Sequence, residues 1–120
     1  MKTRLLTFAV ALAALATPSA AHHGWAGYLD EEFALTGTVA GANLGGPHGI
    51  IRMRVGRQTW NVVLSPPTRI QRAGLTSAAI PVGTRVTARG HRHRNPRTLE
   101  MKSERLVVGN RTFDLYPERS

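Results

Sequence analysis

Five histidines carry the metal-binding chemistry of this sequence, because neutral imidazole is the commonest metal ligand among protein side chains. They fall into three groups: His22 with His23, His48 alone, and His91 with His93. The chain has no cysteine, so thiolate metal sites and disulfide bonds are excluded. What the histidines can do therefore depends on where processing and folding place them.

The beginning of the chain has the pattern of a secretory signal peptide. Lys2 and Arg4 give a positive start, residues 5–16 form an apolar stretch too short to span a bilayer, and small residues follow at 18–21. We therefore expect residues 1–21 to be removed as a signal peptide. The mature protein is then expected to be periplasmic or secreted.

Cleavage after Ala21 makes His22 the first residue and gives it a free α-amine. This amine has a reference pKa of about 7.7–8.0, so a binding divalent ion displaces its proton readily. The amine and the His22 ring then hold the ion as a bidentate chelate. A third nitrogen from His48 or His23 completes a T-shaped or tetragonal set, which favours copper(II) over zinc. Cleavage after Ala20 leaves a third-position histidine instead, which also suits copper or nickel. The sequence thus predicts a copper site at His22, His23 and His48; the alternative is two solvated histidines left there by chance.

The other histidines admit more than one interpretation. His48 lies in a loop and is either a third metal ligand or a hydrogen-bond partner of a strand end. His91 and His93 are two residues apart on an expected strand and so share one face. Val86 and Ala88 occupy the opposite, inner face, so both histidines are expected on the solvated side of a basic strand.

Removal of residues 1–21 from a chain of 120 leaves 99, enough for one small domain. We expect this domain to span 22–120, with residues 22–32 as an N-terminal arm that ends in an acidic run at 30–32. No second apolar segment follows the leader, so no membrane span is expected after processing.

The chain is strongly basic, with 16 lysines and arginines against 7 aspartates and glutamates and a net charge of +9. Loss of Lys2 and Arg4 with the leader leaves the mature chain at +7. Such a balance favours a polyanionic partner, although it also suits a solvated surface that binds nothing. Export and scattered aromatic residues argue against nucleic acid. The alternative function to metal binding is therefore an interaction module whose arginine-rich face binds an anionic envelope component or protein.

Alternating apolar and polar residues predict an all-β protein with one short helix. The expected strands span residues 33–39, 49–55, 59–64, 84–93, 99–108 and 112–115, and the expected helix spans 68–74. The OB-fold, a small Greek-key barrel, has this order: three antiparallel strands, then a helix, then two or three further strands. We therefore expect an OB-like barrel of five to six strands, with a two-sheet sandwich as the rival arrangement.

The inward positions of these strands give the expected core. Its members are Leu35, Val39, Ile51, Met53, Val55, Val62, Val86 and Leu106. A small barrel also needs glycines or bulges where its strands bend. Gly37, Gly41 and Gly90 stand inside strand patterns where they can serve this purpose.

The sequence offers no set of catalytic residues. The three acidic residues of the run at 30–32 crowd together as a solvated turn rather than an acid/base pair. Ser65 and Ser103 have no glycine elbow and no evident histidine partner. We therefore expect a binding protein and not an enzyme.

Several segments together resemble a known family. They are His22-His23-Gly24-Trp25, residues 35–39, Pro47-His48-Gly49, and residues 60–67, 81–91 and 100–105. In this order they resemble a family of small exported bacterial proteins of unknown function, with a His-His-Gly or His-His-Ser mature N-terminus and an Asn-Pro-His loop. The resemblance implies an envelope protein with an OB-like barrel and a loop histidine at His48. Gly46 stands where that family usually carries asparagine, so the resemblance gives no support to such a side chain holding His48 here.

Overall fold

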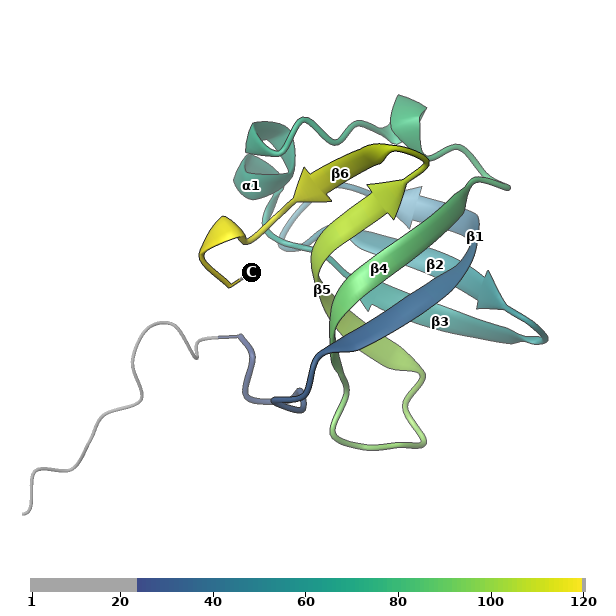
Figure 1. The fold of residues 1–120 in the computed structure, drawn as a ribbon, viewed down its shortest axis with the longest axis vertical. Helices are drawn as coiled ribbons and strands as arrows, with labels where there is room; N and C mark the ends of the chain where they lie inside the picture. The colour runs from purple at the N-terminus through teal and green to yellow at the C-terminus, as the bar shows by residue number, and fades with distance from the viewer. Residues whose placement is uncertain (1–23, 120) are drawn as a thin grey trace, which may run out of the picture.

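Six strands form one continuous sheet in the part of the chain that the computed structural model describes, residues 24–119 (Figure 1). They are β1 (Phe33–Asn43), β2 (Ile50–Val55), β3 (Gln58–Val63), β4 (Arg85–Arg92), β5 (Glu100–Val108) and β6 (Arg111–Asp114). The strand order is β3-β2-β1-β4-β5-β6, and neighbours in this order are antiparallel. A parallel pairing between β3 and β5 closes the first five strands into a barrel, with β6 added outside the ring. The expected OB-like barrel is confirmed, and the sandwich is wrong.

Glycines allow the strands to bend around this small barrel. The register of β1 against β2 shifts next to Gly41, and the register of β4 against β5 shifts next to Gly90. A Cβ atom at Gly90 would collide with the backbone of Lys102, and one at Gly37 would collide with the carbonyl oxygen of Arg54. The three glycines therefore serve the curvature that the sequence led us to expect.

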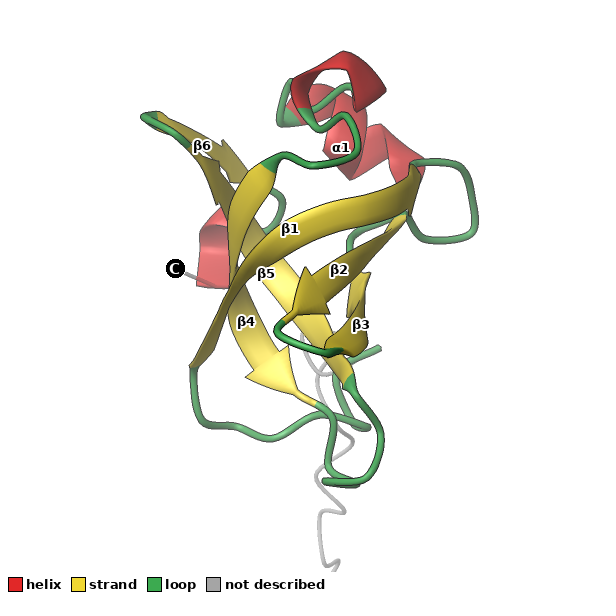
Figure 2. Ribbon diagram, turned by 90° about the vertical axis from the view of Figure 1, so that its right-hand side faces the viewer, coloured by secondary structure: helices red, strands yellow, loops and turns green. Residues whose placement is uncertain are grey.

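One end of the barrel is covered by the segment between β3 and β4 (Figure 2). It contains helix α1 (Pro67–Arg72) and a 3-10 turn at Ser77–Ala79, in agreement with the short helix expected at 68–74. Proline at the start of α1 has the fixed φ of a first helical residue and lacks an N–H that would go unsatisfied there. Ile70 of α1 is 2% exposed and closes this end of the core. Within residues 24–119, no helix is long and apolar enough to cross a membrane.

The core forms inside the barrel as expected. Seven of its eight expected members are buried, and Val55 is half-buried against them. Met53 and Met101 are both fully buried and belong to this core. Trp25 also belongs to this cluster, although it precedes the first strand by eight residues.

Two strand ends differ from the expectation in ways that bear on the site. β1 continues to Asn43, four residues beyond the expected end, because Gly41, Ala42 and Asn43 pair with β2. β4 ends at Arg92, and His93 forms an isolated bridge with Tyr28 of the arm instead. The β1–β2 loop, residues 44–49, lies against the end of the barrel that α1 covers, because Gly49 bonds to Ser65 and packs beside Ile70.

Candidate functional site

The arm is fixed to the barrel by Trp25. Its indole ring is 8% exposed and lies 4.6 Å from the Nζ of Lys102 and 4.0 Å from the Cζ of Arg119, measured to the ring centroid. Two cations on one indole are favourable cation–π contacts. The rings of Tyr116 and His91 approach Trp25 edge-on, at centroid distances of 5.1 and 5.5 Å. Residues from β4, β5 and the C-terminal turn thus surround this side chain and hold it against the barrel.

Hydrogen bonds continue this attachment along the arm. The Nζ of Lys102 donates to the carbonyl oxygen of Gly24 at 2.8 Å, and the hydroxyl of Tyr28 donates to Glu100 at 2.8 Å. Burial, followed by the hydrogen bond to Glu100, raises the pKa of Tyr28 above its ordinary value. The backbone N–H of Leu29 donates to the carbonyl of Arg92. The chain is therefore held in place from Gly24 onward.

His48 lies in the β1–β2 loop and is half-buried. Its pKa is lowered from the ordinary value, first by desolvation and then by the positive charge of Lys102. Within residues 24–119, its ring makes no hydrogen bond. Neutral imidazole is the form that binds metal ions.

Lys102 connects the two parts of this region. The same ammonium group that holds the Gly24 carbonyl is close enough to His48 to lower its pKa. The side chain is buried, and burial followed by the charge of Arg119 lowers the pKa of Lys102 as well. Sequence reasoning gave Lys102 no role, because a lysine within a basic strand is usually solvated.

His91 is buried, so the expectation that it faces solvent is wrong. It is 8% exposed, its Nδ1 lies 2.8 Å from the carbonyl oxygen of Leu29, and its Nε2 lies 2.6 Å from a carboxylate oxygen of Glu104. The reason is that the arm and the C-terminal turn cover the outer face of β4 and β5. Both ring nitrogens are occupied, so His91 attaches the arm and is not a free ligand. His93, beyond the end of β4, is half-buried against Tyr28.

The structure describes part of the predicted copper site. His22 and His23 lie outside the described residues, and His48 lies within them. In the range 24–119, no three His, Cys, Asp or Glu side chains gather closely enough to hold a metal ion. The acidic run at 30–32 is exposed, as expected.

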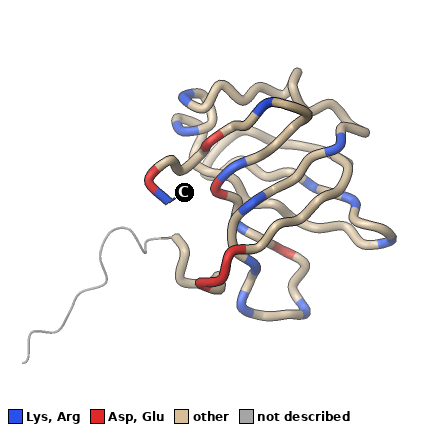
Figure 3. Tube along the Cα trace, viewed as in Figure 1, with Lys and Arg blue, Asp and Glu red and all other residues tan. Residues whose placement is uncertain are grey.

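Most arginines of the described chain lie on the surface without a carboxylate partner, and basic residues occur on many sides of the barrel (Figure 3). The arginine ion pairs found within 24–119 join Arg69 to Glu118 and Arg119 to Glu104. A protein of this charge presents unneutralised guanidinium groups to any anionic partner.

Comparison with known proteins identifies the fold and a family but no activity. A model of a family of unknown function, DUF6152, matches residues 10–102. The fold is similar to the crystal structure of the S. pombe Stn1-ten1 complex, with a TM-score of 0.50, 13% identity, and coverage of 67% of this chain and 59% of that one. At this identity the likeness concerns the fold alone. No curated protein matches the sequence.

Proposed function

The chain belongs to the DUF6152 family, whose function is unknown, and we propose from its own residues that the mature, exported protein binds one copper(II) ion. The α-amine and ring of His22 form the chelate, and His48 or His23 completes the set of nitrogen ligands. Such a set suits the tetragonal geometry of copper(II). The protein acts as a periplasmic or secreted binding protein rather than an enzyme.

The position of Lys102 supports this proposal more than any other observation. Its ammonium holds the carbonyl of Gly24 at 2.8 Å and acts on the ring of His48. His22 precedes Gly24 by two residues, a distance of at most about 7 Å along an extended chain. Only a short segment would therefore separate the proposed amine from the part of the arm that Lys102 holds, which supports His48 as a third ligand.

The charge of Lys102 also limits what kind of site can form there. An ammonium group opposes any bound cation, so a single imidazole beside it would bind a metal ion weakly. A chelate of amine and imidazole, supported by a third nitrogen, offsets this repulsion. Binding is therefore expected to depend strongly on the free N-terminus.

Titration of copper(II) into the processed protein, residues 22–120, tests the proposal. Isothermal calorimetry is expected to show one site, and acetylation of the His22 α-amine is expected to weaken it by about tenfold or more, equal to about 1.4 kcal/mol. Acetylation is used because a residue added before His22 would move His23 to the third position, which also suits copper. His93→Ala is the matched control, because His93 is half-buried and outside the predicted ligand set. If the acetylated protein binds copper as tightly as the protein with a free terminus, the His22 chelate is wrong.

A second candidate function has its own support. We propose as this alternative that the arginine-rich surface binds an anionic envelope component, because most surface arginines between residues 24 and 119 have no carboxylate partner. The two functions respond differently to conditions. Binding to a polyanion weakens with salt and does not need the free terminus, whereas copper binding needs the terminus and is less sensitive to salt.

A further inference from the structure

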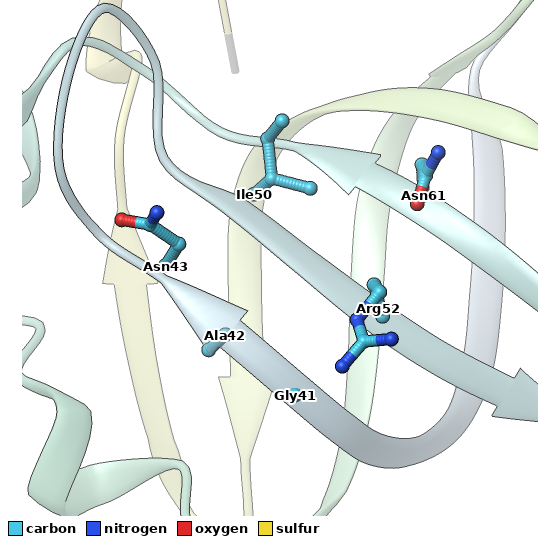
Figure 4. A pocket seen from close by; sticks show the side chains of 6 residues that line it. All are labelled: Gly41, Ala42, Asn43, Ile50, Arg52 and Asn61. Carbon is cyan, nitrogen blue, oxygen red and sulfur yellow. The ribbon is translucent and has the colours of Figure 1, made fainter.

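A groove of about 380 Å³ crosses the outer faces of β1, β2 and β3 beside the β1–β2 loop (Figure 4). Its lining consists of Gly41, Ala42, Asn43, Ile50, Arg52 and Asn61. One cation, two amides and an exposed aliphatic side chain therefore line one surface. No carboxylate is among these residues.

The guanidinium of Arg52 has a defined position in this groove. Arg52 lies opposite Gly41 on one side and Asn61 on the other. A Cβ atom at Gly41 would stand 2.5 Å from a terminal nitrogen of Arg52, so the missing side chain leaves the room in which the guanidinium rests across β1. No carboxylate within residues 24–119 pairs with Arg52. The groove therefore holds a positioned and unneutralised cation.

Polar and basic side chains without a carboxylate continue along the sheet on both sides of Arg52. In the row on one side, the strand register aligns Asn43, Ile50 and Val63. In the row on the other side, it aligns Thr38, Arg54 and Thr59. These two rows add a second arginine, two threonine hydroxyls and, at Ile50 and Val63, apolar side chains. Neither row contains a carboxylate. Arg52 and Arg54 point to the same face and are about 6.6–6.8 Å apart along the strand.

The chemistry of this surface distinguishes between classes of anionic ligand. Two arginines in a row suit a chain that carries repeated negative charges. The amides of Asn43 and Asn61 and the threonine hydroxyls can bond the hydroxyls of a sugar, and Ile50, which is 40% exposed, offers an apolar contact for a ring face. Single-stranded nucleic acid binds by stacking its bases on aromatic rings, and no aromatic residue lines the groove.

We infer that this groove binds an acidic polysaccharide chain, with the guanidinium of Arg52 on a sugar carboxylate. The inference rests on the second proposed function, for which it names the ligand class and the place of binding. It is independent of copper, because the groove lies on strands that contribute no predicted metal ligand.

Calorimetric titration of the metal-free processed protein with an oligogalacturonate of about six sugars, at low salt, tests the inference. Arg52→Gln is expected to weaken binding by about fivefold or more, or about 1 kcal/mol. Gly41→Ala is expected to weaken it similarly without removing a charge, because it displaces the guanidinium. Arg89→Gln, which removes an exposed arginine from β4, is the matched control and is expected to change affinity by less than about twofold.

The possible failures are distinguishable. If the protein binds the oligogalacturonate but Arg52→Gln and Arg89→Gln weaken it equally, the groove is wrong and the general arginine-face function stands. If the protein does not bind the oligogalacturonate, the acidic-polysaccharide inference is overturned. If a thymidine oligonucleotide instead binds and loses affinity with Arg52→Gln, the groove belongs to nucleic acid and the inference is again overturned.

Discussion

Replacing Trp25 by alanine removes the main attachment of the arm. The indole is 8% exposed and contacts two cations, Lys102 and Arg119, as well as two rings. A tryptophan buries about 150–250 Å², which at about 25 cal/mol per Å² gives about 4–6 kcal/mol as an upper limit. Release of a few arm residues offsets part of this loss, because each freed residue regains conformational entropy of about 1–2 kcal/mol. We therefore expect Trp25→Ala to lower the free energy of unfolding by about 3 kcal/mol.

Urea denaturation of the processed protein measures this loss. With a slope of about 1–3 kcal/mol per molar urea, the midpoint is expected to fall by about 1–3 M. Trp25→Phe keeps an aromatic ring between the two cations, so its urea midpoint is expected to fall by about half as much as that of Trp25→Ala. Hydrogen exchange gives a local measure, because the amide of Leu29, which donates to the carbonyl of Arg92, should lose protection. An unchanged midpoint together with full protection of Leu29 would refute the role assigned to Trp25.

Three further predictions follow from other parts of the molecule. Intact mass of the exported protein should correspond to residues 22–120, and a retained leader would remove the terminal amine on which the copper proposal depends. Val62→Ala should lower the free energy of unfolding by about 1–3 kcal/mol in a urea titration, because Val62 is fully buried in the barrel; a change below about 0.5 kcal/mol would contradict its place in the core. The ring of His48 should titrate below its ordinary pKa of 6.5 in an NMR experiment. Its lowered pKa favours the neutral form in the fold, so the associated stability is present above pH 6.5 and is lost as pH falls through the lower value. A midpoint at or above 6.5 would contradict the effects of burial and of the Lys102 charge on this ring.

The barrel could be predicted from the sequence because its strands bury one face. Ile51 and Met53 alternate with Arg52 and Arg54, so a period of two separates core from surface. The end of β1 could not be predicted in this way. Glycine and asparagine at 41–43 are typical of a loop, and their pairing with β2 depends on a bulge that the alternation does not reveal.

The surroundings of His91 were unpredictable for a different reason. Alternation correctly places its side chain outside the barrel, but it does not say what covers the outside. The carbonyl of Leu29 that contacts His91 is 62 residues away in the sequence, and Gly24 is 78 residues from its partner Lys102. Contacts of this separation arise from the packing of the arm, which has no periodic pattern of its own.

The arm relates the fold to the proposed copper site in a way that two changes can separate. The proposed chelate at His22 would use atoms of one residue, so it would need only a free terminus. On this proposal His48 joins it only if the arm is seated, because Trp25 and Gly24 hold the arm beside Lys102, whose charge acts on His48. Trp25→Ala should therefore weaken copper binding without abolishing it, whereas acetylation of the N-terminal amine should remove most of the affinity. Equal copper affinity of Trp25→Ala and the unaltered protein would exclude His48 as the third ligand and leave His23 in that place.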